Sequence, residues 1–331
     1  MSLRSRGSLG SQSERAGQMI SVILCTYNRC ASLASALESV LVSILPSAVE
    51  WEIVCVDNNS KDQTREIVED AILRHPGRAR YLFEGRQGKS HALNLGIREA
   101  RGEVLAFMDD DVTVEPNWLH SLTTPLRAPE WAGVGGRILP AQAITAPSWL
   151  ALEGPQSMAG MLALFDLGDQ ACEMHRAPFG TNMAFRKSMF EKYGGFLTNM
   201  GPCPGSEMRN EDIEFAERLF AGGERLWYEP SAIVYHAVPE VRLKKPYFLA
   251  FWFDHGRAQV RMWKKKSAVL GIPRRFFTLL KLGLSLPART LRWILSLNSQ
   301  RRFFYKGFLW MTAGTMIEIW RELTHSPDQG A

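Results

Sequence analysis

The sequence predicts an α/β protein: a doubly wound, mostly parallel sheet flanked by helices, followed by a basic helical C-terminal region. Two patterns carry this prediction. Up to residue 111, four apolar runs rich in β-branched residues alternate with helical patterns, an order typical of parallel sheets with right-handed crossovers. From residue 239 onwards, apolar residues recur with Lys and Arg at helical spacing.

The expected strands are short apolar runs, each followed by polar residues. The second, Trp51–Val56, ends at Asp57–Ser60, and the third, Tyr81–Phe83, leads into Arg86–Lys89. The full set of expected strands is Met19–Cys25, Trp51–Val56, Tyr81–Phe83 and Val104–Met108.

Helical patterns follow the first three strands. The first helix presents one apolar face made of Leu33, Leu37, Val40 and Leu41. Ser60 with Gln63 has the spacing of a capping box, so we expect the second helix to start there and to reach about Arg74. The third helix is expected from Ser90 to Arg101, where a glycine stops it.

The carboxyl ends of parallel strands meet at one edge of a sheet, where ligands bind. Here these ends are Thr26–Arg29, Asp57–Ser60, Arg86–Lys89 and Asp109–Asp111. Two carboxylates about 5 Å apart repel by about 3 kcal/mol at an effective dielectric of about 20, so Asp109–Asp111 favours proton uptake or a bound cation. A hard divalent metal that carries phosphate suits such a cluster. Neither GxGxxG after the first strand nor a GxxxxGKS/T loop is present, which argues against a dinucleotide-binding or P-loop protein.

The composition is that of an ordinary globular protein, with 46% hydrophobic and 22% charged residues. The five cysteines are odd in number and scattered without CxxC spacing, which fits a reducing cytosol. Met1–Gln18 is rich in Ser, Gly and Arg and lacks the apolar core of a signal peptide, so we expect a disordered tail. The longest candidate for a membrane span, Gly307–Ile317, falls short of the about 18 apolar residues required.

Charge is unevenly distributed. Glu240–Trp310 holds 16 Lys and Arg against 2 Asp and Glu, a balance of +14 in a chain of net +5, so the rest of the chain stands at −9. Ile272–Leu284 and Pro287–Leu297 predict basic amphipathic helices. With the aromatic-rich Phe303–Trp320, the region 272–320 is expected to lie on an anionic membrane, which places the protein in the cytoplasm at the inner membrane face. The alternative is that these helices pack on the preceding domain or on a second subunit.

Five motifs occur in one order along the chain. They are CTYNR at Cys25–Arg29, VDNNS at Val56–Ser60 with Asp62 and Thr64, GKSHALN at Gly88–Asn94, DDD at Asp109–Asp111 and NED at Asn210–Asp212. In this combination the sequence resembles the family 2 glycosyltransferases, over about Met19–His236. The resemblance implies a GT-A fold that transfers a sugar, with inversion, from a nucleoside-diphosphate sugar to a hydroxyl of a glycan or lipid-linked acceptor. It further implies Mn²⁺ or Mg²⁺ as cofactor and UDP-sugar as the expected donor.

The resemblance implies a catalytic domain at 19–238, with a nucleotide half at 19–111 and an acceptor half at 112–238. Composition and charge add a tail at 1–18 and a basic helical region at 239–331. Asp57 would accept from the nucleotide base, since the helix cap falls to Ser60. Lys89 and Arg86 flank a helix N-terminus, where two cations can meet phosphate. The expected nucleotide-sugar contacts are Thr26, Tyr27, Arg29, Asp57, Arg86, Lys89, Asp109 and Asp110.

For metal and catalysis, the resemblance places Asp109 and Asp111 at the two ends of the family's DxD motif, with Asp111 the first-choice ligand. His236 would be a third metal ligand or a phosphate contact. Asp212 would act as the general base that takes the acceptor proton, with Glu211 orienting rather than reacting. The acceptor side is expected at Gly180, Thr181 and Asn182.

Each of these residues also has a structural interpretation. Asp57–Ser60 could simply form a turn and cap a helix, and Arg86 and Lys89 could be solvated charges of a loop. Glu211 and Asp212 could be present because acidic residues favour the first turn of a helix, and His236 could be a structural residue at the end of a strand. For the whole protein, the alternatives are a nucleotidyltransferase on a similar sheet and a non-catalytic basic module that binds membrane or polyanions. The absence of a GxGxR-type loop argues against the first, and the acidic body argues against nucleic-acid binding.

Two further segments bear on mechanism. Gly201–Ser206 is rich in Gly and Pro and leads into the NED motif, as a mobile lid would. Gln259, Arg261 and Trp263 have the spacing QxRxW rather than the QxxRW of processive polysaccharide synthases, which argues against a processive enzyme. Arg257 and Arg261 remain candidates for contacting the leaving diphosphate.

Overall fold

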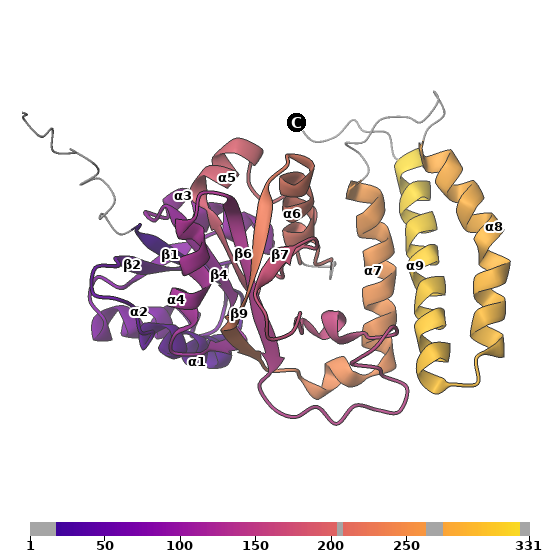
Figure 1. Cartoon of the computed structure of the whole chain (residues 1–331), viewed down its shortest axis with the longest axis horizontal. Coiled ribbons are helices and arrows are strands. Elements are labelled where there is room, and N and C mark those ends of the chain that lie inside the picture. The colour runs from indigo at the N-terminus through magenta and orange to yellow at the C-terminus, as the bar shows by residue number, and fades with distance from the viewer. Residues whose placement is uncertain (1–17, 204–207, 263–273, 325–331) are drawn as a thin grey trace, which may run out of the picture.

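The computed structural model describes residues 18–203, 208–262 and 274–324. These residues form one sheet flanked by helices and a layer of helices that stands beside it (Figure 1). Residues 1–17 of the expected tail lie outside the described residues, so that prediction stays untested.

The four predicted strands form one parallel block. They are β1 (Ile20–Thr26), β2 (Trp51–Asp57), β3 (Ala79–Phe83) and β4 (Val104–Asp109). β1 pairs with both β2 and β4, and β2 pairs with β3, all in parallel. Nearly every residue of β1, β2 and β4 is buried, as a parallel sheet covered on both faces requires. The polar ends of these strands therefore meet at one edge, as predicted.

The connecting helices are α1 (Cys30–Leu41), α2 (Thr64–Arg74) and α3 (Lys89–Glu99). The apolar face predicted for α1 is buried. The capping box predicted at Ser60 is wrong, because Ser60 Oγ accepts a hydrogen bond from the Asn28 N–H at 3.0 Å. Asp62 instead caps the start of α2, because its carboxylate accepts hydrogen bonds from the N–H and the hydroxyl of Thr64 at 3.1 and 2.6 Å.

The second half of the sheet mixes strand directions. Its strands are β5 (Val112–Val114), β6 (Trp131–Pro140), β7 (Cys172–Met174), β8 (Asn182–Arg186) and β9 (Arg225–His236). Their order continues the sheet as β3-β2-β1-β4-β8-β6-β9-β5, with β7 on β9. β8 runs antiparallel to both β4 and β6, so the sheet is parallel up to β4 and mixed beyond it. The strand–helix alternation that predicts parallel pairing also ends at β4.

Short helices and turns join the strands of this mixed half of the sheet and lead on from it. They are α4 (Trp118–Thr123), α5 (Lys187–Tyr193) and α6 (Glu211–Ala221), with 3-10 turns η2 (Thr124–Arg127), η3 (Ala159–Leu162) and η4 (Glu240–Leu243). α6 begins directly at the predicted NED motif, which places Glu211 and Asp212 in its first turn. The turn η4 leads from the end of β9 towards the C-terminal helices.

The C-terminal helices are α7 (Lys245–Met262), α8 (Arg274–Leu295) and α9 (Ser299–Thr324). In the layer that they form, α9 stands between α7 and α8 (Figure 1). α7 packs closely on α9, because a Cβ at Gly256 or Gly314 would overlap the backbone of the other helix. The two basic helices predicted on either side of Pro287 are one helix, α8, with Pro287 inside it.

Side chains also hold this layer in place. Arg257 Nε and Arg261 Nε of α7 lie 3.0 and 2.7 Å from the carboxylate of Glu318 on α9, so both arginines tie helices together. Phe248 of α7 and Phe303 of α9 are buried in one apolar cluster with part of the segment between β6 and β7. None of the described helices combines the length and apolar character needed to cross a membrane.

Candidate active site

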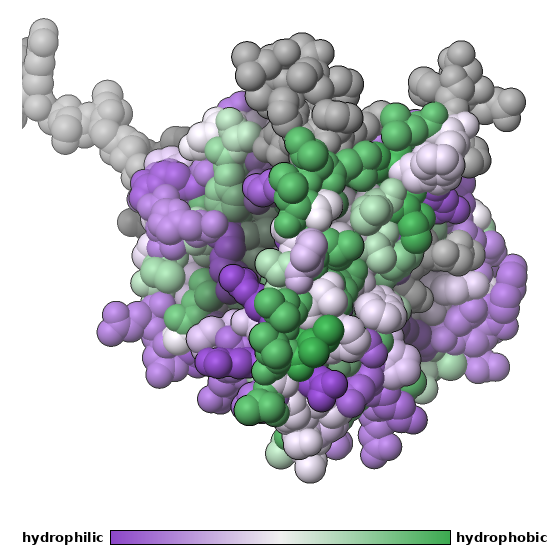
Figure 2. Space-filling model, turned by 90° about the vertical axis from the view of Figure 1, so that its right-hand side faces the viewer, coloured by the Kyte–Doolittle hydropathy of each residue, from purple (hydrophilic) through white to green (hydrophobic). Residues whose placement is uncertain are grey.

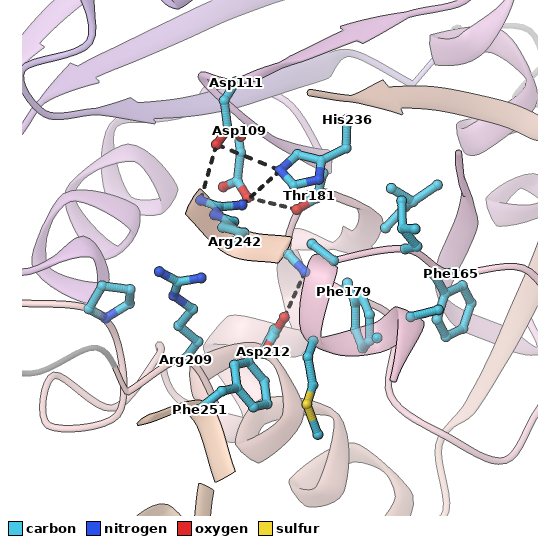
Figure 3. A pocket seen from close by; sticks show the side chains of 18 of the residues that line it. Asp109, Asp111, Phe165, Phe179, Thr181, Arg209, Asp212, His236, Arg242 and Phe251 are labelled. Carbon is cyan, nitrogen blue, oxygen red and sulfur yellow. Dashed lines mark hydrogen bonds and ion pairs between the residues drawn. The ribbon is translucent and has the colours of Figure 1, made fainter. Parts of the chain in front are cut away.

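The carboxyl ends of β1, β2 and β4 open into a cavity of about 1470 Å³. The other walls come from the segment between β6 and β7, from the start of α6 and from α7 (Figure 3). The predicted donor-side residues that line it are Thr26, Tyr27, Arg29, Lys89, Asp109, Asp110 and Asp111. Gly180, Thr181, Glu211, Asp212 and His236 line the same cavity. The structure therefore brings most of the predicted donor, acceptor and catalytic residues into one space.

Arg29 binds two of the three clustered aspartates. Its Nη1 donates to Asp110 Oδ1 at 3.0 Å and to Asp111 Oδ2 at 2.8 Å. Burial outweighs the nearby Arg29 charge and raises the pKa of Asp110 to about 6. In this structure, the guanidinium group of Arg29, from the loop after β1, therefore balances part of the negative charge of the acidic cluster.

Asp111 is surrounded by basic side chains. His236 Nε2 and Arg242 Nη2 each lie 3.7 Å from Asp111 Oδ2, the oxygen that also accepts from Arg29. Burial alone would raise the pKa of Asp111, but its contact with His236 and the charges of Arg29 and Arg242 hold the pKa below its usual value. Asp111 is therefore ionised at neutral pH, as a metal ligand must be.

Lys89 lines the cavity between Asp109 and Glu211. It follows Gly88, whose φ of +133° favours glycine and turns the chain into α3. Lys89 Nζ lies 2.5 Å from Asp109 Oδ1 and 3.7 Å from Glu211 Oε1, and Thr181 donates to Asp109 Oδ2 at 2.7 Å. Burial opposes the charge on Lys89, but Asp109 and Glu211 outweigh it and raise the pKa of Lys89 above its usual value. Lys89 is therefore a fixed positive charge between the DDD and NED motifs.

Asp212 and Glu211 face the cavity from the first turn of α6. The N–H of Gly180 donates to Asp212 Oδ2 and that of Ile213 to Oδ1, both at 2.7 Å. Burial outweighs these hydrogen bonds and raises the pKa of Asp212. Burial likewise raises the pKa of Glu211 to about 7, and its Oε2 has no hydrogen-bond partner within the described part of the chain. Carboxyl groups with a raised pKa are suited to accept a proton.

The residues around Asp111 fit a divalent metal that arrives with a ligand. Among residues 18–203, 208–262 and 274–324, no group of three or more His, Cys, Asp or Glu is arranged to hold a metal ion. Asp111 and His236 nevertheless converge from just beyond β4 and from the end of β9, with 3.7 Å between Oδ2 and Nε2. Mg²⁺ is usually held by one or two protein ligands, with substrate phosphates and water completing its shell. A two-residue donor set therefore fits an ion that is shared with a diphosphate.

Two predicted donor contacts are engaged elsewhere. Asp57 is buried beside the cavity, and its two carboxylate oxygens accept from the Ser60 N–H and the Tyr81 hydroxyl, each at 2.8 Å. The argument that capping by Ser60 leaves Asp57 free is therefore wrong. Arg86 does not line the cavity, and its Nη2 pairs with Glu84 Oε2 at 2.7 Å. Their roles in nucleotide binding stay predictions.

Asn182, expected on the acceptor side, is buried behind Gly180 and Thr181 and does not reach the cavity. It is fully buried, and its amide accepts from the Trp118 indole at 2.8 Å and donates to the carbonyl groups of Arg137 and Ala232 at 2.9 and 2.7 Å. The two residues before it line the cavity, but Asn182 does not. Residues 204–206 of the expected lid lie outside the described residues.

Two residues of the site were not singled out from the sequence. Asn58 lines the cavity and accepts from the Gly88 N–H at 2.8 Å, which shapes the loop that presents Lys89. Its place directly after Asp57 in the VDNNS motif is the signal that could have identified it. Arg242 lies 3.1 Å from His236, between Nη1 and Nε2. It stands in the turn η4, where no periodic pattern marks it.

Known proteins match this chain in sequence. The model of the family described as Glycosyl transferase family 2 matches residues 21–194. A glucosyl-dolichyl phosphate glucuronosyltransferase from Haloferax volcanii is 28% identical over 250 residues, which cover 72% of this chain and 76% of that protein. The succinoglycan biosynthesis protein ExoM from Rhizobium meliloti is 26% identical over 249 residues, which cover 75% and 76%.

Solved structures share the fold. The mannosyltransferase PcManGT from Pyrobaculum calidifontis, in complex with GDP-Man and Mn²⁺, matches with a TM-score of 0.63 at 20% identity, over 96% of this chain and 91% of that one. TarS 1–349 from S. aureus matches with a TM-score of 0.51 at 14% identity, over 93% of each chain. The family model covers more than half of the sequence, and the chain is therefore a family 2 glycosyltransferase with a GT-A-type fold.

Proposed function

We propose that this enzyme transfers a sugar from a nucleoside-diphosphate sugar to a hydroxyl group in a metal-dependent, inverting displacement, with a UDP-sugar as the first donor to test. The observation that carries the proposal is the position of Asp212. This half-buried carboxyl, whose pKa is raised, shares one cavity with the cluster of Asp111, His236 and Arg242 (Figure 3). A single displacement requires such a base and a separate site for the leaving group, with the sugar held between them.

The proposed step conserves atoms and charge. The acceptor hydroxyl gives its proton to Asp212 as its oxygen forms a bond to the anomeric carbon. The bond between that carbon and the diphosphate breaks, and its electron pair leaves on the phosphate oxygen. Lys89, Arg29 and Arg242 are cations of the cavity that stabilise the charge developing there. A Mn²⁺ or Mg²⁺ ion held by Asp111 and His236 would add charge neutralisation on the diphosphate.

The relatives support the finer parts of this proposal. PcManGT is solved with a nucleoside-diphosphate sugar and Mn²⁺, which supports a divalent cofactor here. The Haloferax volcanii relative is named for a dolichyl phosphate-linked sugar, which supports a lipid-linked glycan as acceptor over a free one.

We also propose that the enzyme works at the surface of an anionic membrane. The outer face of α8 exposes Leu280, Leu284, Leu291 and Ile294 at helical spacing, with Leu284 75% exposed. Figure 2 shows hydrophobic residues gathered along this side of the molecule, with hydrophilic residues at its edges. α9 adds the exposed Trp310 and Trp320, and Trp is enriched at membrane interfaces. The inner face of α8 packs on α9, so the outer face is the one available to lipid.

Replacement of Asp212 by Asn tests the catalytic assignment. Asn keeps the size of the side chain and can still accept from the Gly180 N–H, but it cannot take up the acceptor proton. We expect Asp212→Asn to lower kcat by on the order of 10²- to 10⁴-fold, with the Kd of the donor little changed. Initial rates of nucleoside diphosphate release and isothermal titration with the donor measure the two quantities.

Asp70→Asn, an exposed position on α2, serves as the matched control and should keep full activity. A fully active Asp212→Asn enzyme would remove Asp212 from the role of base. Release of pyrophosphate in place of a nucleoside diphosphate would identify a nucleotidyltransferase instead.

A further inference from the structure

One wall of the cavity is apolar and contains none of the predicted site residues. This aromatic wall consists of Phe165, Phe179, Phe251 and the stretch from Met158 to Leu164. The rings of Phe165 and Phe179 lie 5.1 Å apart. Met158 is buried in the apolar cluster that joins this stretch to α7 and α9, so the wall is backed by the helical layer. Phe251 itself belongs to α7.

The aromatic wall begins beside the proposed base. Phe179 precedes Gly180, whose N–H holds Asp212 Oδ2 at 2.7 Å. In Figure 3, Asp212 lies close to both Phe251 and Phe179, and the cluster around Asp111 lies on the far side. An acceptor whose hydroxyl reaches Asp212 from outside the donor site must therefore place its neighbouring atoms against this wall.

Two arginines of the cavity stand at opposite ends of the aromatic wall, Arg176 at Phe165 and Arg209 on the side of Phe251 (Figure 3). The guanidinium carbon of Arg176 lies 4.7 Å from the centre of the Phe165 ring. Arg209 stands three residues before Asp212, and its Nη1 donates to the Tyr247 hydroxyl at 3.1 Å. Both line the cavity. Guanidinium groups are well suited to phosphate, since they present paired N–H donors and stay charged.

We infer that the aromatic wall and Arg176 form an acceptor subsite that recognises a lipid phosphate. The hydrocarbon next to the phosphate packs on the aromatic wall, the phosphate meets Arg176, and the sugar that follows presents its hydroxyl to Asp212. The inference rests on the proposed function, because it takes Asp212 as the base. Removing apolar surface from water is favourable when the partner is itself apolar, which selects a lipid-linked acceptor over the end of a soluble polysaccharide.

The position of the subsite agrees with this occupant. α7 presents Phe251 to the cavity and packs on α9, which in turn packs on α8 with its exposed leucines. The same layer therefore borders the cavity on one side and presents the apolar outer face on the other. A lipid held in a membrane beneath α8 and α9 would reach the cavity along this layer. The balance of +14 over residues 240–310 complements anionic lipid and opposes a second copy of the same layer.

Binding of three probes to the full-length enzyme tests the subsite. Dodecyl phosphate below its micelle concentration combines hydrocarbon and charge, dodecyl maltoside supplies hydrocarbon without phosphate, and inorganic phosphate supplies charge alone. We expect dodecyl phosphate to bind most tightly in isothermal titration. Phe251→Gln should weaken it about tenfold, as expected for a loss of about 1.4 kcal/mol. Phe253→Gln, a matched change on the same helix that borders a separate hollow, should leave binding unchanged.

Arg176 provides a second variant at an exposed position, where folding is not at risk. Arg176→Gln should weaken dodecyl phosphate and leave dodecyl maltoside unaffected, and Arg176→Lys should restore part of the loss. Equal losses in Phe251→Gln and Phe253→Gln would place the amphiphile on the outer helices and overturn the inference. Equal affinity for dodecyl phosphate and dodecyl maltoside would also overturn it. Donor binding should be unchanged in all variants, and a wild-type enzyme that binds no nucleotide sugar would refute the proposed function instead.

Discussion

Glu211 is a buried carboxyl group held between two opposing influences. It is 4% exposed, Lys89 lies 3.7 Å from its Oε1, and Asp212 stands next to it. Burial and the charge of Asp212 outweigh Lys89, so the pKa of Glu211 is raised from 4.5 to about 7. The proton on this side chain therefore links folding to pH.

The raised pKa of Glu211 makes the folded protein less stable as the pH rises. In the unfolded chain Glu211 loses its proton near pH 4.5, whereas in the folded protein it keeps the proton to about pH 7. The stability that it contributes is fully present below pH 4.5 and is lost as the pH rises through 7. Glu211→Gln should therefore reduce the fall in the free energy of unfolding across this window, measured by urea denaturation at several pH values.

The exposed Glu217 on the same helix serves as the control, and Glu217→Gln should keep the wild-type slope. A Glu211→Gln protein whose free energy of unfolding falls as steeply as that of wild type would contradict the assignment.

Sequence reasoning found site residues where a motif is local and missed them where contacts are distant. Asp109–Asp111 end an apolar strand, and Asp212 opens a helix, so both were visible along the chain. The capping prediction failed at Ser60 because its hydroxyl accepts a hydrogen bond from the backbone N–H of Asn28, which is distant in sequence. Arg242 stayed hidden because its importance comes only from folding back onto His236 and Asp111.

Among the elements, α8 carries the sharpest test of membrane contact. Leu284 and Leu291 lie on its outer face, 75% and 55% exposed. Replacing both with Glu removes apolar surface and adds charges that an anionic membrane repels. We expect Leu284→Glu/Leu291→Glu to weaken binding to phosphatidylglycerol vesicles by about tenfold per leucine, measured by co-sedimentation.

Leu73→Glu on α2 is a matched exposed leucine outside the helical layer, 78% exposed, and should leave vesicle binding unchanged. Binding of the wild type should weaken as salt is raised, because screening reduces attraction between the basic layer and the lipid headgroups. Undiminished binding of the double variant would place membrane contact elsewhere on the molecule.

The elements were predicted best where the hydrophobic pattern is strongest. β1, β2 and β4 are buried apolar runs, and all were found within a residue or two of their ends. The direction of β8 was not predicted, since a strand pattern does not encode whether its neighbours are parallel. Pro287 was expected to separate two helices, but α8 continues through it. A proline removes one backbone hydrogen bond, and helices are able to tolerate that loss with a kink.

At the scale of the whole molecule, ligand binding should appear as thermal stabilisation. A donor at about 100 times its Kd adds about 2.7 kcal/mol to the free energy of unfolding. We expect one of a UDP-, GDP- or dTDP-sugar to raise the Tm, and Mn²⁺ to increase that rise. A thermal-shift panel of the three sugars, each with and without Mn²⁺, measures both effects.

Asp111→Asn should abolish the contribution of Mn²⁺ to this stabilisation while leaving a smaller rise from the donor alone. Asp169→Asn, an exposed carboxyl paired with Arg137, is the control and should keep the Mn²⁺ effect. An undiminished Mn²⁺ effect in Asp111→Asn would move the metal site away from this cluster.

The pairing of Arg29 with Asp110 and Asp111 affects the charge change that would accompany metal binding. An acidic pocket without a partner would attract any stray cation, but here a side chain of the protein already serves as the counter-ion. A divalent ion held by Asp111 would replace that guanidinium as its partner, so the local charge would rise by one unit in place of two. Arg29 would stay in the loop after β1, at the edge where the donor phosphates are expected. Under the proposed function, Arg29 would pair with Asp110 and Asp111 before the donor binds and would contact the donor phosphates afterwards.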